Sequence, residues 1–304
     1  MAEDGGAGAG AGAGAATSPE AGGALARVTD MRVGVVGAGG RMGREVCRAV
    51  LQRPGLDLVA AIDTGVPGAT VAELTGLRGP DASGVTVTAG LDALLDSGAE
   101  VVVDFTHLEV ARATIAYCAT AGIHVVVGTT GFDEGDLDEL ATLFPADGGT
   151  GANCIVAANF AIGAVLMMRF AAMAAPWFDG AEIIELHHDA KRDAPSGTSL
   201  RTAEGMAAAR AAAGRDVFPP DATATVVVEG ARGGTGPGGV RMHAVRLPGL
   251  VAHQEVLFGS AGQGLTIRHD SYDRASFMDG VVLAVESVAT RPGLTLGIEP
   301  LLGI

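Results

Sequence analysis

The chain has 304 residues, 48% of them hydrophobic, and carries a formal net charge of −15 at pH 7. A chain of this length buries a core without a disulfide or metal staple, and no apolar run is long enough to span a bilayer, so we expect a soluble globular protein of one or two domains. The negative net charge excludes nucleic acid and anionic membranes as partners, because both bind basic protein surfaces.

The first 30 residues are rich in Gly and Ala, with few charges and no bulky apolar block, so we expect a disordered leader at 1–30. They lack the segments typical of a secretion signal or a transit peptide, which favours the cytoplasm. A reducing cytoplasm also suits three cysteines that are far apart and lack metal-ligand spacing: Cys47, Cys118 and Cys154. We therefore expect no metal.

Residues 31–52 predict a buried strand, a glycine-rich turn and a helix. The turn fits the pattern G-x-x-G-x-x-G through Gly37, Gly40 and Gly43. Such a bend lets a dinucleotide pyrophosphate lie at a helix N-terminus, although a glycine pattern alone is weak in a Gly-rich chain. A second strand ends in Asp63, at the place where an acidic residue would hold the ribose hydroxyls of the dinucleotide. Alternatively, Asp63 is an ordinary turn residue.

Apolar strands continue to alternate with helices as far as about residue 160, which predicts a parallel sheet covered on both faces. In such sheets the ligand lies at the carboxyl ends of the strands. Small and hydroxyl-bearing residues there suit a nicotinamide and its ribose, although each group alone could be a plain turn: Phe105-Thr106, Gly128-Thr129-Thr130 and Ala158-Asn159-Phe160.

The strongest chemical signal lies in Glu185–Leu200, which contains two adjacent histidines and the only lysine of the chain. Lys191 can donate a proton or act as a compact charge, whereas Arg cannot give up its proton. Strand alternation places His187 on the face of Glu185 and His188 on the other face. We therefore assign chemistry to His187, and binding or packing to His188.

A helix is expected to begin at Pro195-Ser196, because Pro suits an early helical position and a Ser oxygen can cap a free N–H. Free N–H groups and the positive end of the helix dipole make Ser196, Gly197 and Thr198 a candidate carboxylate or phosphate cradle. A single histidine at a strand end is more often a packing residue, but histidines beside a lysine and an anion cradle favour a catalytic site.

From about Phe160 the sequence predicts strands separated by Gly- and Pro-rich turns, at 222–230, 240–247, 252–260 and 263–271. They should form an open mixed or antiparallel sheet with one face on helices that begin near Ala161 and Thr198. The other face needs cover, which suggests a homo-oligomer. We assign three histidines of these strands to structural roles: His243, His253 and His269.

The last helix, from about 273 to 289, and the tail are expected to return to the first domain. The expected α/β fold is a Rossmann-like parallel-sheet dinucleotide domain, 31–159 with 272–304, plus an α+β substrate-binding and oligomerisation domain, 160–271, with an open mixed sheet.

Four motifs, the Gly37–Gly43 turn, GTTGF, AANFAIG and ELHHDAKRDAPSGTSL, together resemble the 4-hydroxy-tetrahydrodipicolinate reductase (dihydrodipicolinate reductase) family of the bacterial lysine and diaminopimelate pathway. The similarity runs from about Met31 to the C-terminus and includes VAHQEVLFG and LTIRHDS. It implies reduction of a cyclic unsaturated imine dicarboxylate by NADH or NADPH, with tetramers assembled through the open sheet.

The same resemblance implies residue roles. His187 would be the proton donor or acceptor and Lys191 a second donor, while substrate carboxylate would be held by His188, Gly197 and Thr198, together with Ser196 from the helix start described above. Dinucleotide contacts would come from Gly37, Ala38, Gly39, Gly40, Arg41, Met42, Asp63, Gly128, Thr129, Thr130, Ala158, Asn159, Phe160 and Ala161. Some members carry a Glu-Arg pair at Asp63, whereas Thr64 follows it here, which leaves a 2′-phosphate without a partner and favours NADH over NADPH.

Two alternatives remain open. One is a non-catalytic NAD(H)-sensing regulator, against which the intact histidine, lysine and Ser-Gly-Thr set argues. The other is a different two-domain dehydrogenase acting on an amino acid or a semialdehyde. An acylating enzyme would need an activated cysteine, and none of the three lies in such a loop.

Overall fold

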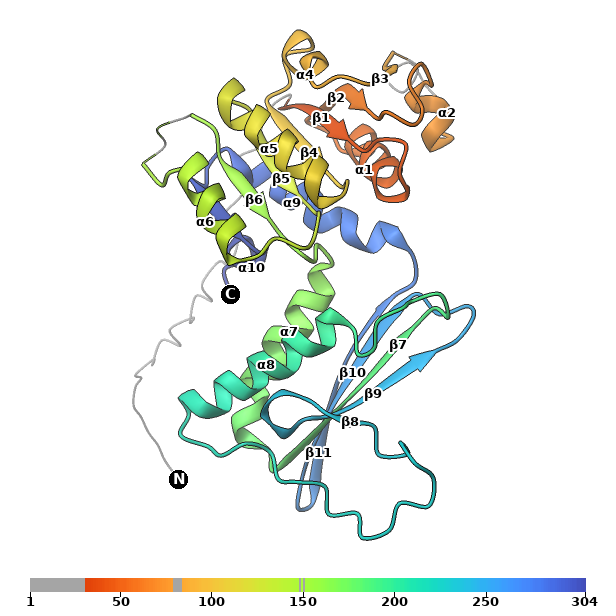
Figure 1. Ribbon diagram of the computed structural model, residues 1–304, viewed down its shortest axis with the longest axis vertical. Helices are drawn as coiled ribbons and strands as arrows, with labels where there is room; N and C mark the ends of the chain where they lie inside the picture. Colours follow the sequence, from red (N-terminus) through yellow and green to blue (C-terminus); the bar gives the residue numbers. More distant parts are fainter. Residues whose placement is uncertain (1–30, 79–83, 148, 150) are drawn as a thin grey trace, which may run out of the picture.

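The structure is a computed structural model that describes residues 31–78, 84–147, 149 and 151–304. The predicted leader, 1–30, lies outside the described residues. The chain forms two lobes, one built on a parallel sheet and one on a mixed sheet, joined by the start of a long helix and by the segment that follows the last strand of the mixed sheet (Figure 1). Among the described residues, no helix has the length and apolar character needed to cross a membrane.

The first lobe contains a seven-stranded sheet in the order β12-β6-β5-β4-β1-β2-β3, and all its pairings are parallel, as expected. Its strands are β1 Met31–Val36, β2 Leu56–Ile62, β3 Val87–Thr88, β4 Val101–Asp104, β5 His124–Val127, β6 Cys154–Val156 and β12 Leu294–Leu296. The edge strand β12 comes from the C-terminal tail and pairs with β6, so the tail completes this sheet.

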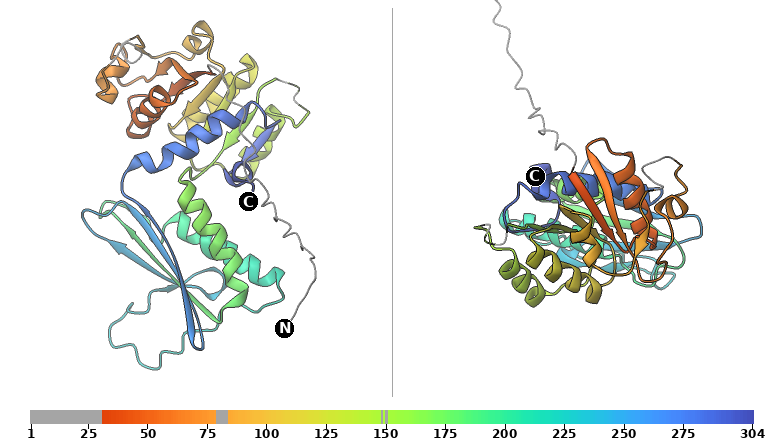
Figure 2. Two further views of the ribbon diagram at one scale, coloured as in Figure 1. Left: turned by 180° about the vertical axis from the view of Figure 1, so that it is seen from behind. Right: turned by 90° about the horizontal axis from the view of Figure 1, so that it is seen from above.

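Helices cover both faces of the parallel sheet, because successive strand residues point to opposite sides. Val101 and Val103 pack on the side of α1 and α9, while Val102 packs on the side of α5. The helices of this lobe are α1 Arg41–Gln52, α2 Val71–Thr75, α4 Asp92–Asp96, α5 Leu108–Ala121, α6 Glu134–Leu143, α9 Met278–Val288 and α10 Glu299–Leu302. Figure 2 shows α9 running across the sheet lobe after the chain returns from the mixed sheet.

The second lobe contains a five-stranded sheet in the order β11-β10-β7-β9-β8. Strands β7 and β9 are parallel and the other pairs are antiparallel, which confirms the expected mixed sheet. Its strands are β7 Gly180–His187, β8 Gly234–Thr235, β9 Arg241–Arg246, β10 Ala252–Ser260 and β11 Gln263–Ser271. One face packs on helices α7, Ile162–Ala174, and α8, Gly197–Ala212, around Ile183, Met206 and Phe258.

The strand predicted at 222–230 is wrong. The segment is irregular, and its valines Val226, Val227 and Val228 are 52%, 90% and 67% exposed. A run of β-branched residues favours a strand only where a neighbouring strand and a half-buried surface exist, and this segment pairs with no strand of its own chain in the described structure. The two-residue strand β8, which follows this segment, pairs with β9 instead.

Short 3₁₀ helices complete the described structure at η1 Ala175–Trp177, η2 Pro237–Gly239 and η3 Arg274–Phe277.

Candidate active site

The turn before α1 accepts only glycine at its tightest points. Gly37 has φ 81°, in the left-handed region that favours glycine, and a methyl group on Gly43 would overlap with the carbonyl oxygen of Gly37. Gly40 caps α1 without a side-chain hydrogen bond, so the N-terminus of this 12-residue helix keeps free N–H groups. The turn and helix therefore fit the pyrophosphate of a dinucleotide.

Asp63 lies directly beside this turn. Its Oδ2 atom accepts the N–H of Gly39 at 2.8 Å and its Oδ1 atom accepts the N–H of Gly65 at 2.8 Å. Both bonds fix the carboxylate next to the glycines, where an acid can bind the ribose hydroxyls of a dinucleotide. The structure thus brings together two predicted features that are 24 residues apart.

The predicted strand ends also meet at one edge of the sheet. The Phe105 ring fills the space that any side chain at Gly128 would need, and it packs on Phe160 with 5.6 Å between ring centroids. Asp104, a residue absent from our predictions, is fully buried here, and its Oδ1 atom accepts bonds from Thr106 and Thr129. Aromatic packing and hydrogen bonds therefore join these strand ends at the carboxyl edge of the sheet.

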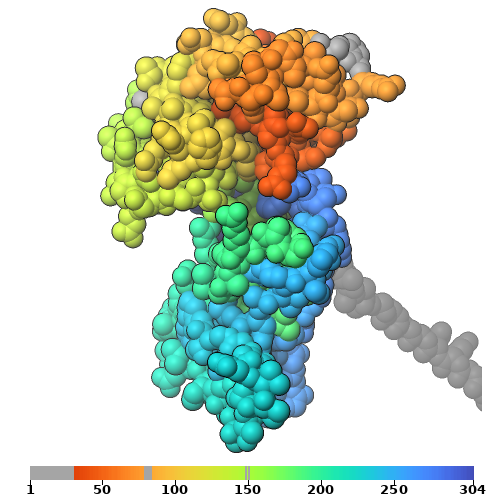
Figure 3. Space-filling view, turned by 45° about the vertical axis from the view of Figure 1, so that its right-hand side comes forward, coloured from red at the N-terminus to blue at the C-terminus, as the bar shows by residue number. Residues whose placement is uncertain are grey.

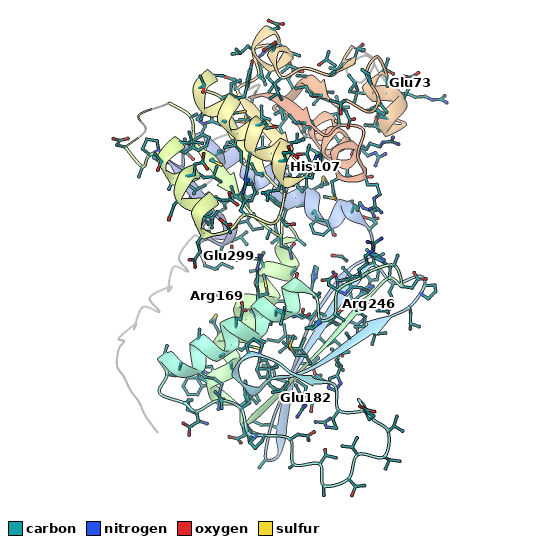
Figure 4. All side chains as sticks on the ribbon, viewed as in Figure 1. Glu73, His107, Arg169, Glu182, Arg246 and Glu299 are labelled. Carbon is teal, nitrogen blue, oxygen red and sulfur yellow. The ribbon has the colours of Figure 1, made fainter. Side chains whose placement is uncertain are left out.

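His187 ends β7 and points into a network of buried charges. Its Nδ1 atom lies 2.5 Å from Oε2 of Glu185, which has no exposed surface. Arg246 grips the same carboxylate with both terminal nitrogens, at 2.8 and 2.7 Å, and the N–H of Ser196 donates to it at 3.2 Å. Nε2 is consequently the ring nitrogen that His187 has available for a ligand. Figure 4 shows Arg246 near the end of the sheet that faces the other lobe, and Glu182 toward the opposite end.

Lys191 lies in the loop after His187, where its Nζ atom is 2.8 Å from Oδ1 of Asp193. That hydrogen bond is the main cause that lowers the pKa of Asp193 below its usual range, so Asp193 is ionised at neutral pH. Arg246 also donates to the backbone oxygen of Asp193 at 2.7 Å, which ties this loop to β9. His188 is exposed in the same loop.

Helix α8 begins where the sequence predicts it, at Ser196. The Ser196 hydroxyl accepts the N–H of Ser199 at 3.2 Å, and a buried chain of bonds continues from Ser199 to Gln254, at 2.7 Å, and on to Thr202, at 2.8 Å. This chain fastens the helix start to β10. Because the Ser196 hydroxyl serves as the cap, the groups left to bind an anion are the first backbone N–H groups and the Thr198 side chain.

Space for a ligand lies next to these groups. A methyl group on Gly197 would meet nothing within 4 Å. A cavity of about 210 Å³ is lined by residues from both lobes: Ala158, Asn159, Ala161, Ala164, Met167, His187, Ser196, Thr198, Ala252, His253, Gln254, His269, Ser271 and Phe277. Figure 3 shows the molecule narrowing where the two lobes meet. Lys191, His188, the glycine turn, Asp63 and the Gly128–Thr130 segment do not line this cavity.

Two histidines that we assigned to structural roles line the cavity as well. His253 is held by Asp270, with 2.7 Å between Nδ1 and Oδ1, and its Nε2 atom accepts the N–H of Val251. His269 packs against Gly163 at the start of α7, and burial lowers its pKa, so it is neutral at pH 7. The sequence already places both histidines on predicted strands, but their position at the cavity that His187 lines depends on how β10 pairs with β7 and β11.

A larger cavity, about 610 Å³, lies around Glu182, Asp221, Arg232 and Arg241 and contains none of the predicted site residues. Its size therefore gives no reason to prefer it. In the described ranges, no group of three or more His, Cys, Asp or Glu side chains is arranged to hold a metal.

The turn before α1 has the glycines that a dinucleotide-binding turn needs, and a histidine paired with a carboxylate lies where the two lobes meet. These features place the protein among the two-domain, dinucleotide-dependent oxidoreductases. The chain belongs to the dihydrodipicolinate reductase family. Family models for the N-terminus and the C-terminus of dihydrodipicolinate reductase match residues 31–160 and 163–302, which confirms the resemblance seen in the motifs.

Individual relatives agree along nearly their whole length. The chain is 49% identical over 276 residues to the 4-hydroxy-tetrahydrodipicolinate reductase of Nocardia farcinica, covering 90% of this chain and 99% of the relative. It is 49% identical over 275 residues to that of Mycolicibacterium vanbaalenii, covering 90% and 100%. A solved structure, the dipicolinate-bound dihydrodipicolinate reductase from Paenisporosarcina sp. TG-14, superimposes with a TM-score of 0.76 at 38% identity, covering 90% of this chain and 99% of that one.

Proposed function

We propose that this protein reduces 4-hydroxy-tetrahydrodipicolinate, or the dihydrodipicolinate formed from it, to tetrahydrodipicolinate with NADH or NADPH, in lysine and diaminopimelate biosynthesis. The observation that carries the proposal is that His187, Thr198 and Ala158, which follows β6, line one cavity. In the proposed enzyme this arrangement would place a proton donor and an anion cradle beside the dinucleotide-binding sheet. The 49% identity to relatives that carry this reductase name supports it.

The substrate is a dicarboxylate, so at least two anion contacts are needed. One carboxylate would bind the free N–H groups at the start of α8 and the hydroxyl of Thr198. The second would bind Lys191 and His188, after Lys191 releases Asp193. A substrate carboxylate can replace the Asp193 carboxylate with little cost, since that side chain is 60% exposed.

The bound dinucleotide supplies the hydride. Gly37 to Met42 would hold its pyrophosphate at the start of α1, Asp63 its ribose hydroxyls, and the segments 128–130 and 158–161 its nicotinamide half. Ala38, Phe160 and Ala161 are buried, so any contact from them would be made by the backbone.

Hydride addition to a conjugated imine builds negative charge on carbon and nitrogen, which a proton donor must neutralise. His187 would give the proton from Nε2, because Nδ1 is engaged by Glu185. The Lys191 ammonium, the only lysine in the chain, would stabilise the developing charge or give a proton itself.

NADH is the proposed reductant of preference. The Asp63 carboxylate is fixed by the N–H groups of Gly39 and Gly65, so a 2′-phosphate would meet a fixed negative charge. Thr64 next to it offers no positive charge.

The wider organisation is part of the proposal. Residues 31–159 and 272–304 would form the dinucleotide-binding domain, and residues 160–271 the substrate-binding and oligomerisation domain. The face of the mixed sheet opposite α7 and α8 would be covered by other copies in a homotetramer, and the protein would work in the cytoplasm.

Loss of reduced-nicotinamide absorbance tests the function directly. Purified protein is mixed with NADH and the condensation product of aspartate semialdehyde and pyruvate, with Lys191→Ala assayed in parallel. We expect turnover by the wild type and a loss of about 10²–10⁴-fold in the variant, the usual contribution of a proton donor. Binding of NADH without any turnover would reject the reductase and favour a sensor.

A further inference from the structure

Glu185 occupies a position where an apolar residue would be ordinary. It follows Ala181 and Ile183 on the helix-covered face of β7, and its side chain has no exposed surface. An ionised carboxylate taken out of water destabilises the fold unless it is paired and fully hydrogen-bonded. Here it accepts bonds from His187, Arg246 and the N–H of Ser196.

These partners keep the carboxylate charged. Burial acts to raise the pKa of Glu185, but the hydrogen bonds and charges of His187 and Arg246 outweigh burial and leave the pKa below its ordinary value. An ionised carboxylate has no proton to give, so the proton between the two groups belongs to Nδ1 of His187. The neutral ring of His187 must therefore present Nε2 as an acceptor.

Arg246 joins three parts of the site that are separate in sequence. In the pairing of β7 with β9, Arg246 is the residue aligned with His187, so the two side chains project from the same face of the sheet. Its guanidinium binds both oxygens of Glu185 and the backbone oxygen of Asp193 in the Lys191 loop. Through Glu185 it is also connected to Ser196, where the anion cradle begins.

We infer that Glu185 and Arg246 are a positioning pair for the reaction proposed above: Glu185 sets the tautomer and orientation of His187 and stabilises its protonated form, and Arg246 locks Glu185 and the Lys191 loop in place. The inference rests on the proposed function for its kinetic consequence. When His187 gives its Nε2 proton to the substrate, the ring passes from imidazolium to the neutral Nδ1–H form that Glu185 already holds. No reorientation of the ring is needed.

The titratable groups near His187 or in the adjoining loop come from four strands and one loop. Glu185 lies on β7 and Arg246 on β9, while His253, held by Asp270, and the neutral His269 belong to the lining of the cavity on β10 and β11. The loop contributes Lys191, paired with Asp193. Of the described carboxylates, Glu185 is the one bonded to the His187 ring.

The first test needs no variant. Nitrogen NMR of ¹⁵N-histidine-labelled wild-type protein reports which ring nitrogen carries the proton, and loss of a signal in His187→Gln assigns it. We expect the neutral ring of His187 to be in the Nδ1–H form. A neutral ring in the Nε2–H form would overturn the inference, whether or not the protein turns over the proposed substrate.

The second test compares Glu185→Gln and Glu185→Asp with a matched control. Glu182 lies on the same strand and also bonds a histidine and an arginine, His243 and Arg232, but it lies outside the His187 cavity. We expect Glu185→Gln to lower kcat by about 100-fold with a much smaller change in KM, and to shift the pH profile of kcat, with partial recovery in Glu185→Asp. Glu182→Gln should change none of these.

Folding is checked by circular dichroism and by NADH binding, which depends on the other lobe. If Glu185→Gln does not fold, Arg246→Lys tests the same pair, since a lysine keeps the positive charge but cannot make the bidentate hydrogen bonds to the Glu185 carboxylate. A folded Glu185→Gln protein with unchanged kcat and pH profile would refute the positioning role. Absence of turnover by the wild type would refute the proposed function alone, because the NMR result stands without it.

Discussion

The ammonium of Lys191 is 2.8 Å from the carboxylate of Asp193, two residues further along the same loop. The only lysine of the chain is thus already paired before a substrate arrives, and it must exchange an internal carboxylate for one on the substrate. Asp193 is 60% exposed and Lys191 21%, so the pair can open without unfolding anything around it.

Lys191→Arg separates charge from proton donation. Arginine keeps the positive charge but does not release its proton, so we expect a loss in kcat of about 100-fold together with near-normal binding of a dicarboxylate analogue such as dipicolinate. Steady-state kinetics and calorimetry measure the two effects. Arg192→Lys is the control in the adjacent exposed position, and equal kcat in Lys191→Arg and wild type would show that only the charge matters.

Gly197→Ala tests the anion cradle. The new methyl group would enter open space at the start of α8, where a carboxylate is expected to approach the backbone, so KM for the substrate should rise about tenfold while the fold is retained. Gly205→Ala, inside the same helix and in ordinary contact with Ala172, is the control. That control should keep its KM and gain roughly 0.5–1 kcal/mol of stability. An unchanged KM in Gly197→Ala would place the carboxylate elsewhere.

Thr64→Arg tests the reductant preference. A positive charge beside Asp63 would offer a 2′-phosphate the partner it lacks, so the ratio of kcat/KM for NADPH to that for NADH should rise by about tenfold or more. The experiment uses both reductants with wild type and variant. A wild-type enzyme that already prefers NADPH would contradict the assignment.

Acid stability should depend on Glu185. Its pKa is lowered in the folded state, so its contribution to stability is present above its ordinary value of 4.5 and is lost as the pH falls from there through the lower folded value. Thermal unfolding of wild type and Glu185→Gln between pH 7 and pH 3 should therefore show a flatter decline for the variant below about pH 4.5. Parallel curves for the two proteins would mean that Glu185 does not titrate with folding.

Local patterns predicted most of the fold correctly. Long apolar or alternating runs located β1, β2 and β7 to within a residue or two, and the Pro195-Ser196 pair located the start of α8. The segment 222–230 failed because strand formation needs a partner that β-propensity does not report. The three-residue strand β12 was missed because it is too short to show a period.

The sequence grouped candidate site residues that are neighbours in the chain, but it did not indicate residues that only strand pairing brings beside them. The face shared by Glu185 and His187 follows from strand alternation. Arg246 is 61 residues from Glu185, and only the pairing of β9 with β7 brings them together. The same holds for His253 and His269, which reach the cavity through β10 and β11.

The most direct test of the central claim is NADH oxidation with the freshly condensed substrate by wild type, His187→Gln and His243→Gln. His243 also bonds a carboxylate, Glu182, but it does not line the His187 cavity. The account predicts turnover by wild type and His243→Gln, and a loss of about 100-fold or more in His187→Gln with NADH still bound. Equal turnover by His187→Gln, or none by a wild-type protein that binds NADH, would contradict it.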